Sequence, residues 1–410
     1  MKDGRLGMGL VGPGFVARHH IDAARRLGDV DVIGLAGSSP ESAARKATDF
    51  KVALVYADYS ELVNDPAVDV VHNTTPNYVH APVILAALRA GKHIISDKPL
   101  GMTIDECRQL TEAAAEANVV NAVTFNYRGN PLVQEARLRM AAGELGDLVY
   151  IHGHYLQDWM TNENVYSCRM DPERGGASSA LADIGSHWRD LAEHMTGLRI
   201  VSVLADMGTV VPPRYFAGAS AEAFGRDGGG DHHAVAVHGE DLVTVLLRFD
   251  NGARGSLKVG QVLPGHKNDL QIEVNGRKGS FRWEQERQNE LWFGRHHAAN
   301  LVLMKDPALL SEQAARYACL PGGHQEGWAD ALRNVMADIY ECIRDGGNLR
   351  KAPSVCTFAD ATRIACIIDA MLRSAADGRV WKDVTVPGSL SKMQEHDHHS
   401  TSVPAGRVTR

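Results

Sequence analysis

The feature that most constrains the fold is the alternation of apolar runs and helical patterns over the first 125 residues. Helical patterns, for example at residues 81–90 and 104–117, separate the apolar runs. Such alternation is typical of a parallel sheet with helices on both faces, because each parallel crossover needs a helix to return the chain. Ligands of such sheets bind beyond the carboxyl ends of the strands. The apolar runs that we expect to be strands cover residues 6–11, 30–36, 68–73, 93–96 and 119–125.

A glycine-rich turn follows the first of these strands, with the sequence Gly-Pro-Gly-Phe-Val-Ala at residues 12–17. Gly12 allows a tight turn, Gly14 lets a pyrophosphate approach the backbone, and Ala17 permits close packing of helix and sheet. The start of the next helix offers amide donors and a favourable dipole to phosphates. We therefore predict a dinucleotide site at this turn, with contacts from Gly12, Gly14, Phe15 and Val16.

The end of the second strand reports on the choice between NAD and NADP. An NAD site usually has an acidic residue there to accept hydrogen bonds from the ribose 2′-hydroxyl. This chain has Gly37-Ser38-Ser39 instead, so no carboxylate repels a 2′-phosphate, but no cation adjoins the serines either. A plain turn before Pro40 explains the sequence equally well. We expect Ser38 and Ser39 to contact the ribose, and both NAD and NADP remain open.

The pattern changes after residue 125, where hairpin signals replace the helical crossovers. Asn-Gly pairs at 251–252 and 275–276 stand between alternating runs and favour the type I′ turns of antiparallel hairpins. Helical patterns recur at 178–196, 327–345 and 357–376, and the segment 212–241 has the composition of a long loop. The second half is therefore predicted to be α+β.

The whole chain is thus predicted to be an α/β protein of two domains and a tail. An N-terminal Rossmann dinucleotide-binding domain covers residues 1–126. A C-terminal α+β domain with a large, mostly antiparallel open sheet covers 127–388, and a flexible tail covers 389–410. The length of 410 residues agrees with two domains of ordinary size.

Composition excludes several classes of partner. The formal net charge of −7 leaves no basic surface for nucleic acid or an anionic membrane. No apolar run approaches the roughly 20 residues that span a bilayer, and the N-terminus has no secretory apolar region. The six cysteines form no CxxC pair of the kind that binds a metal. The tail histidines His396, His398 and His399 lack a rigid scaffold that would fix a metal-coordination geometry. We expect a cytoplasmic protein with no nucleic-acid, membrane or metal partner.

Two sets of polar residues are candidates for chemistry. Thr75, Pro76 and Asn77 follow the predicted strand at 68–73, while Asp97 and Lys98 follow the one at 93–96, so both sets face the crevice where a nicotinamide lies. The positive ring should depress the pKa of Lys98 and make it a proton partner, although a surface lysine before a helix-starting proline fits equally well.

The second set follows Gly175-Gly176 in a predicted helix. Asp183 and His187 stand at i and i+4, so they share one helix face and can enter one pocket. A carboxylate and a histidine held together are suited to moving a proton. Elsewhere, one of His19 and His20 in the first helix could cap the pocket, but both are expected to be structural or solvated.

These motifs together resemble the glucose–fructose oxidoreductase/inositol dehydrogenase (Gfo/Idh/MocA) family. The resemblance covers nearly the whole chain and implies that Lys98, Asp183 and His187 line the reacting carbon. It also implies cofactor contacts from the crevice residues, and sheet-mediated homodimers or homotetramers. Asp97 departs from the pattern, because the family usually has Glu there. The crevice residues are Thr75, Pro76, Asn77, His80, Asp97 and Lys98.

A narrower similarity links the chain to the levoglucosan dehydrogenase-like pyranoside 3-dehydrogenases. It rests on residues 125–128 and 155–159 and on the Gly175-Gly176 helix. An aromatic face suits the apolar side of a sugar ring, and donors and acceptors suit its hydroxyls. A Trp/Tyr pair that only packs the sheet, and a helix-entry loop at His324, remain alternatives. The predicted substrate contacts are Tyr127, Arg128, Gln157, Asp158, Trp159, Asp183, His187 and His324.

The resulting hypothesis is an NAD(P)-dependent enzyme that oxidises a secondary hydroxyl, at C3, of a sugar, glycoside or cyclitol. In it His187 takes the hydroxyl proton, Asp183 orients the substrate or the imidazole, and Lys98 stabilises the alkoxide or relays the proton. Three alternatives stay open: a ketosugar reductase, a glycosidase that oxidises, eliminates and re-reduces, and a nucleotide-binding sensor without activity.

Overall fold

The computed structural model of the chain describes residues 4–216, 233–237 and 239–388. The predicted tail at 389–410, with its three histidines, lies outside the described residues, as does most of the predicted loop at 212–241. The two ends of that loop segment are not irregular, because β9 (Arg214–Phe216) and β10 (His233–Val235) pair as a small antiparallel sheet. No helix of the described residues is long and apolar enough to cross a membrane.

The first 125 residues form the predicted parallel sheet, in the order β3-β2-β1-β4-β5-β6. One strand was not predicted: β3 has only two residues, too few to leave a periodic signal. The strands are β1 (Leu6–Val11), β2 (Val30–Ala36), β3 (Leu54–Val55), β4 (Val70–Asn73), β5 (His93–Ser96) and β6 (Asn121–Val123). The helices between them are α1 (Phe15–Leu27), α2 (Pro40–Phe50), α3 (Tyr59–Asn64), α4 (Asn77–Arg89) and α5 (Ile104–Ala117).

Side-chain caps explain where several of these helices begin. Ser39 accepts a hydrogen bond from the Ser42 amide at the start of α2, and Thr103 accepts one from the Glu106 amide at the start of α5. By contrast, no side chain caps α1, and its first turn carries no acidic residue. The amide groups at the start of α1 are therefore available to an anionic ligand.

The second half forms a nine-stranded sheet in the order β16-β15-β14-β13-β7-β12-β11-β8-β17. All of its pairs are antiparallel except β7 with β12, which confirms the mostly antiparallel sheet. Its strands are β7 (Leu148–Leu156), β8 (Ile200–Gly208), β11 (Leu242–Phe249), β12 (Arg254–Gly260), β13 (Asp269–Gly276), β14 (Gly279–Glu284), β15 (Glu290–Arg295), β16 (Leu301–Met304) and β17 (Lys382–Asp383).

Both predicted hairpins form, but neither has the type I′ turn that the Asn-Gly pairs favoured. Asn251 does not adopt the positive φ that a type I′ turn requires, and only Gly252 does (φ 89°), in a longer loop. In the second hairpin Asn275 and Gly276 belong to β13 itself, and residues 277–278 make the turn. Strand pairing sets the turn position here, because Asn275 pairs with Ser280 across the ladder.

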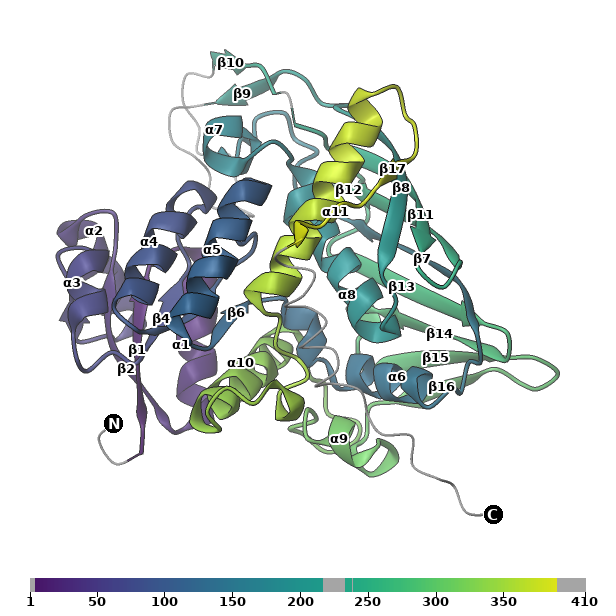
Figure 1. Ribbon diagram of the computed structural model, residues 1–410, viewed down its shortest axis with the longest axis horizontal. Coiled ribbons are helices and arrows are strands. Elements are labelled where there is room, and N and C mark those ends of the chain that lie inside the picture. Colours follow the sequence, from purple (N-terminus) through teal and green to yellow (C-terminus); the bar gives the residue numbers. More distant parts are fainter. Residues whose placement is uncertain (1–3, 217–232, 238, 389–410) are drawn as a thin grey trace.

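Helices cover the face of the large sheet that is turned toward the first sheet (Figure 1). Both α6 (Pro131–Ala141) and α8 (Ser186–Thr196) contact this face.

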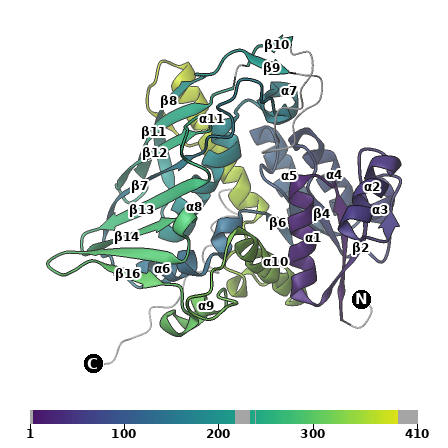
Figure 2. The same ribbon diagram turned by 180° about the vertical axis from the view of Figure 1, so that it is seen from behind.

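The last two long helices, α10 (Trp328–Arg344) and α11 (Phe358–Ala376), return to the first sheet. Helix α10 packs against α1 (Figure 2), and α11 packs against α5 and also against β8 of the large sheet. Residues after 126 thus complete the core of the first sheet. The division of the chain at residue 126 stays a prediction. Two short helices are α7 (Pro172–Gly175) and α9 (Glu312–Ala315).

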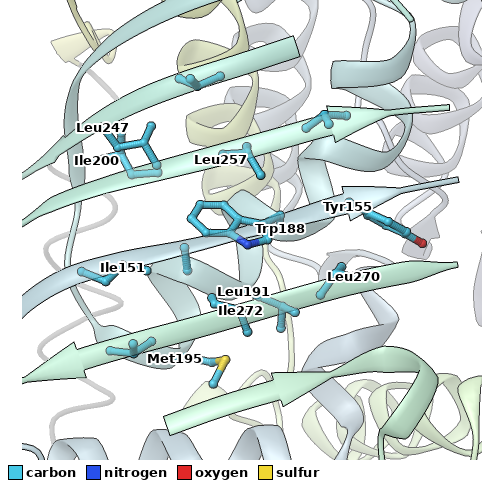
Figure 3. Close-up of a cluster of buried hydrophobic side chains, with 14 of the residues drawn as sticks. Ile151, Tyr155, Trp188, Leu191, Met195, Ile200, Leu247, Leu257, Leu270 and Ile272 are labelled. Atoms are coloured by element: carbon cyan, nitrogen blue, oxygen red, sulfur yellow. The ribbon is translucent and has the colours of Figure 1, made fainter. Parts of the chain in front are cut away.

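Trp188 anchors α8 to the sheet (Figure 3). Its ring is fully buried among apolar side chains from β7, β12 and β13, and its Nε1 donates a 2.9 Å hydrogen bond to the Gln271 carbonyl oxygen. Gly153 of β7 lies directly opposite. A Cβ atom at this position would overlap the Gln271 carbonyl oxygen and lie 2.5 Å from Trp188 Nε1. The absence of a side chain at Gly153 therefore lets α8 reach the sheet.

We expect Gly153→Ala to lower the free energy of unfolding by about 2 kcal/mol, since overpacking a closed core forces backbone shifts. The shift should also displace α8 and reduce enzymatic turnover. Gly208→Ala is the matched control, because Gly208 is also a strand glycine but a Cβ there meets only one atom, at 4.0 Å. Urea denaturation measures both variants, and equal stability of the two would contradict this account of α8.

Candidate active site

A cleft of about 370 Å³ opens where the carboxyl ends of the first sheet face α8, the end of β7 and the start of β13. Its walls come from segments far apart in the sequence, so the fold alone brings them together. They are Phe15, Val16, His19, His20, Asp97, Lys98, Thr124, Asn126, Tyr127, Tyr155, Gln157, Arg169, Asp183, Ile184, His187, Asn268, Trp328 and Leu332. The three predicted catalytic residues, Lys98, Asp183 and His187, all lie in this cleft.

An ion pair across the cleft joins the two halves of the chain. Lys98 follows β5, and its Nζ donates hydrogen bonds to Asp183 Oδ1 at 2.6 Å and to the Asp183 carbonyl oxygen at 2.7 Å. The side chains are only 12% and 10% exposed. Since an ammonium group has three donors, one N–H of Lys98 remains for a ligand.

Two further residues hold the Asp183 carboxylate. Arg169 Nη1 lies 3.2 Å from Oδ1, and Gln261 Nε2 donates a 2.9 Å hydrogen bond to Oδ2. Burial alone would raise the pKa of Asp183, but the charges of Arg169 and Lys98 and the hydrogen bonds from Lys98 and Gln261 hold it well below its usual range. Asp183 is therefore a permanent carboxylate that fixes Lys98.

Asp183 and His187 do not sit in one regular α-helix as predicted. Residues Leu181–Gly185 form a π-helical turn, and α8 begins at Ser186. A π-helical turn inserted before an α-helix is frequent at functional sites, where it re-aims side chains. Both side chains still face the cleft. The carboxylate is engaged by Lys98, Arg169 and Gln261, while its predicted role toward the substrate or the imidazole stays a prediction.

His187 is held by an aromatic wall. The rings of Phe125, Tyr127 and Tyr155 approach it edge to face, with centroid distances of 5.4, 5.1 and 6.1 Å. Burial, followed by the charge of Lys98, lowers the pKa of His187 well below its usual range. The ring is therefore neutral near pH 7. Its Nδ1 is buried and has no hydrogen-bond partner among the described residues.

The glycine turn has the geometry that a bound dinucleotide needs. Gly12 has a φ of 85°, and a Cβ atom on it would lie 2.6 Å from Thr75 Cα, so only glycine fits between the two loops. Gly14 precedes α1, and a Cβ there would meet nothing within 4 Å, which leaves room above the turn. With the uncapped start of α1, these features fit a pyrophosphate.

The other predicted cofactor contacts do not lie together in one place. Asp97 lines the cleft and accepts a hydrogen bond from Thr124, while Ser38 is exposed at the end of β2 and Ser39 caps α2. Asn77 donates to the Gly175 carbonyl oxygen, so it ties α4 to the segment before the π-helical turn.

His80 was predicted to contact the cofactor, and this stays a prediction. Its ring is buried outside the cleft, with its nitrogens 2.9 Å and 2.7 Å from the carbonyl oxygens of Thr75 and Pro99. His80 therefore links the loop after β4 to the loop that carries Lys98.

Of the predicted substrate contacts outside α8 and its π-helical turn, Tyr127 and Gln157 line the cleft. Tyr127 Oη lies 2.8 Å from Tyr155 Oη, while Tyr155 Oη and Gln157 Nε2 both donate to Asn268 Oδ1. This network forms a polar wall of hydroxyl and amide groups opposite the ion pair.

Four predicted substrate contacts do not line the cleft. Arg128 is buried in an ion pair with Asp190, because its position points away from the sheet ends. Asp158 pairs with Lys267, and Trp159 stands behind Gln157 and donates to its Oε1 at 2.9 Å. His324 is exposed in the loop before α10.

Sequence reasoning missed Arg169, Gln261, Asn268 and Trp328. Arg169 lies in a loop without periodicity, while Gln261 and Asn268 follow a strand and precede one, so no local pattern marks them. Trp328 opens α10 from the far end of the chain. In the described part of the chain, no group of three or more His, Cys, Asp or Glu side chains is arranged to hold a metal ion.

Comparison with known proteins places this cleft in context. Residues 6–125 match the oxidoreductase family with an NAD-binding Rossmann fold, and residues 133–282 match the GFO/IDH/MocA C-terminal domain. A levoglucosan dehydrogenase from Pseudarthrobacter phenanthrenivorans is 32% identical over 92% of this chain and 98% of its own length. The scyllo-inositol 2-dehydrogenase (NAD+) of Bacillus subtilis is 27% identical over 74% of this chain and 75% of its own length.

Solved structures agree with the sequence comparison. A levoglucosan dehydrogenase in complex with NADH and L-sorbose superposes with a TM-score of 0.84 at 30% identity. The match covers 93% of this chain and 99% of the other.

The charge arrangement around Asp183 predicts unequal effects of removing its partners. Asp183→Asn leaves the Lys98 and Arg169 cations facing each other in a buried site, so it should lower the free energy of unfolding at pH 7 by about 3 kcal/mol. Lys98→Met should cost less, because Arg169 and Gln261 still hold the carboxylate. Urea denaturation of both variants tests this, and a larger loss for Lys98→Met would contradict it.

Proposed function

The chain belongs to the Gfo/Idh/MocA family of oxidoreductases, and on that premise we propose that it oxidises a secondary hydroxyl, at C3, of a sugar, glycoside or cyclitol. The electron acceptor is a nicotinamide cofactor. The observation that carries the proposal is the buried Lys98–Asp183 ion pair beside a neutral His187, in the cleft that the glycine turn enters. Relatives named for levoglucosan and scyllo-inositol support a cyclic polyol as the substrate.

Residues of the first sheet would hold the cofactor. Gly12 and Gly14 would admit its pyrophosphate, and Asp97 and Lys98 would stand beside its nicotinamide half, because β5 lies on that side of β1. When bound, the nicotinamide supplies an acceptor for hydride. Both NAD and NADP stay within the proposal, since Ser38 and Ser39 neither repel nor bind a 2′-phosphate through a charge, and relatives are named for each.

Residues of the large sheet would hold the substrate. Gln157, Asn268, Tyr127 and Tyr155 present hydroxyl and amide groups that can donate and accept, which suits a ring with several hydroxyls. This wall carries no formal charge and favours a neutral substrate. Trp159 supports it from behind through Gln157.

The proposed mechanism divides the work among three residues. His187 accepts the hydroxyl proton, which its neutral ring and unpartnered nitrogen allow. The third N–H of Lys98 donates to the oxygen as negative charge develops there, which stabilises the alkoxide in a water-poor site. Asp183 acts on Lys98, since its carboxylate and carbonyl oxygen accept hydrogen bonds that hold the ammonium group in the cleft. The carbon that is oxidised is the one whose hydroxyl contacts both His187 and Lys98.

We also propose that a second copy of the chain covers the outer face of the large sheet, which gives a dimer or a tetramer. Outward-facing residues alternate with the buried core along each strand, and several are large and apolar. Tyr150, Leu246 and Val302 are 38%, 45% and 51% exposed on this face. Large apolar side chains exposed on an open sheet face are typical of interaction sites.

The function is tested with purified protein, NAD+ or NADP+, and a panel of pyranosides, aldoses and inositols. Absorbance at 340 nm should rise with at least one of them, and a flat trace across the panel would refute the proposal. His187→Ala and Lys98→Ala should each lower kcat by about 10²–10⁴-fold. The rate of the wild type should fall at acid pH, since a protonated imidazole accepts no proton.

A matched control for these variants is His297→Asn, which changes an exposed histidine in the hairpin between β15 and β16. It should leave kcat unchanged. Near-normal rates in His187→Ala or Lys98→Ala would remove that residue from the mechanism.

The assembly is tested by light scattering of the wild type and of Leu246→Glu. A carboxylate in the covered face should shift the wild-type dimer or tetramer toward smaller species. Val210→Glu places the same charge at a site that is 55% exposed and lies outside the sheet, so it should have no effect. A monomeric wild type would contradict the proposal.

A further inference from the structure

A buried chain of three side chains runs from the cleft into the core of the first sheet. His20 of α1, His72 of β4 and Tyr340 of α10 follow one another, with 3.1 Å between the two Nδ1 atoms and 2.9 Å between His72 Nε2 and Tyr340 Oη. All three are fully buried. The other nitrogen of His20, Nε2, is buried without a partner among the described residues, although the His20 ring lines the cleft.

Both histidines are neutral in this setting. Burial lowers the pKa of His20 to about 4, against a smaller opposing effect of Asp97, and burial lowers the pKa of His72 well below its usual range. A neutral imidazole carries one N–H, so each ring donates at one nitrogen and accepts at the other. The chain therefore has only two possible directions.

Tyr340 decides between these directions. If its hydroxyl donates to His72 Nε2, then His72 donates from Nδ1 to His20 Nδ1, and the proton of His20 sits on Nε2. In the reverse direction, the Tyr340 hydroxyl accepts and its own proton meets no acceptor, because the described part of the chain offers Tyr340 Oη no second partner. In the first direction the donor left over is the Nε2–H of His20, which lines the cleft, so a bound ligand can accept from it, whereas Tyr340 does not line the cleft. An unsatisfied buried donor is costly, so the first direction is favoured once a ligand is bound.

The position of His20 identifies what this donor faces. The glycine turn fixes the pyrophosphate at the start of α1, and the strands on the β4–β5 side of β1 take the nicotinamide half of a dinucleotide. Asp97 follows β5, is close enough to influence the charge of His20, and lines the same cleft. A hydrogen-bond donor and a carboxylate thus stand together on the nicotinamide side.

We infer that His20 is a cofactor-binding residue whose Nε2–H donates to an oxygen of the nicotinamide riboside half, and that His72 and Tyr340 are positioning residues that set its tautomer. A donor beside the Asp97 acceptor suits a ribose hydroxyl, which both accepts and donates. The inference rests on the proposed function, since it needs a nicotinamide cofactor in the cleft. It gives α10, from the far end of the chain, a part in binding the cofactor.

The first test compares the affinities of two ligands, NADH and ADP, for the full chain. ADP carries the pyrophosphate and adenosine but lacks the nicotinamide riboside. His20→Leu should weaken NADH binding about fivefold, the value of one ordinary hydrogen bond, and leave ADP binding unchanged. His20→Gln, which keeps an N–H donor, should recover most of the loss. NADH fluorescence and competition by ADP give both constants.

Tyr56→Phe is the matched control. Tyr56 is also buried in the first half of the chain and its hydroxyl donates to Asp65, but it does not line the cleft. It should change neither affinity. Unchanged NADH binding in His20→Leu would overturn the inference, and so would an equal loss for NADH and ADP, which would mean that His20 only supports α1. Failure of the wild type to bind either NADH or NADPH would instead refute the proposed function.

The second test reads the tautomer. In protein labelled with ¹⁵N-histidine and bound to NADH, His20 should carry its proton on Nε2 and His72 on Nδ1, and NADH should move the Nε2 signal of His20. The signals are assigned by their loss in His20→Gln and in His72→Gln. Tyr340→Phe removes the proton that sets the direction, so His20 should then populate both tautomers. A wild-type His20 protonated on Nδ1 in the NADH complex would overturn the inference.

Discussion

The Lys98–Asp183 ion pair is the interaction on which the organisation of the site depends. It is the contact by which the end of a parallel strand in one half of the chain meets a helical turn of the other half. A buried ion pair is costly to desolvate unless further hydrogen bonds satisfy its atoms. Here Gln261 and Arg169 supply them to the carboxylate. Asp183 belongs to the π-helical turn before α8. This turn places its carboxylate and its carbonyl oxygen so that both accept hydrogen bonds from the Lys98 ammonium group.

The parts of the fold that depend on local periodicity were predictable from the sequence. Except for β3, the parallel strands follow directly from apolar spacing, as do α5 and the helices near 328–344 and 358–376. The Asn-Gly turns were not predictable in this way. The register of β13 against β14 places Asn275 in a strand and overrides its local preference for a turn. The partnership of α10 and α11 with the first sheet was missed for a related reason. It depends on contacts between segments some 200 to 300 residues apart, which no short pattern reports.

The candidate site divides in the same way. Lys98, Asp183 and His187 belong to motifs with a recognisable spacing, and the cleft brings all three together. Arg128 and Asp158 can hydrogen-bond to a sugar, and they adjoin Tyr127 and Gln157 in the sequence. In the structure, however, Arg128 is paired with Asp190 and Asp158 with Lys267. Sequence identifies a polar side chain but not its partner. Asn268 accepts a hydrogen bond within the polar wall, and Gln261 donates one to the Asp183 carboxylate. Only these contacts, and no sequence pattern, identify the two residues.

Four buried histidines near the cleft show how partners separate structural from functional side chains. His72 and His80 have both ring nitrogens within hydrogen-bond distance of other groups, so they hold the surrounding segments in place. His187 and His20 each keep one buried nitrogen without a partner, and both rings line the cleft. An unsatisfied buried polar atom costs stability, so its persistence at a cleft is best explained by a ligand that completes it. By this criterion the first helix contributes a side chain to ligand binding as well as its amide groups.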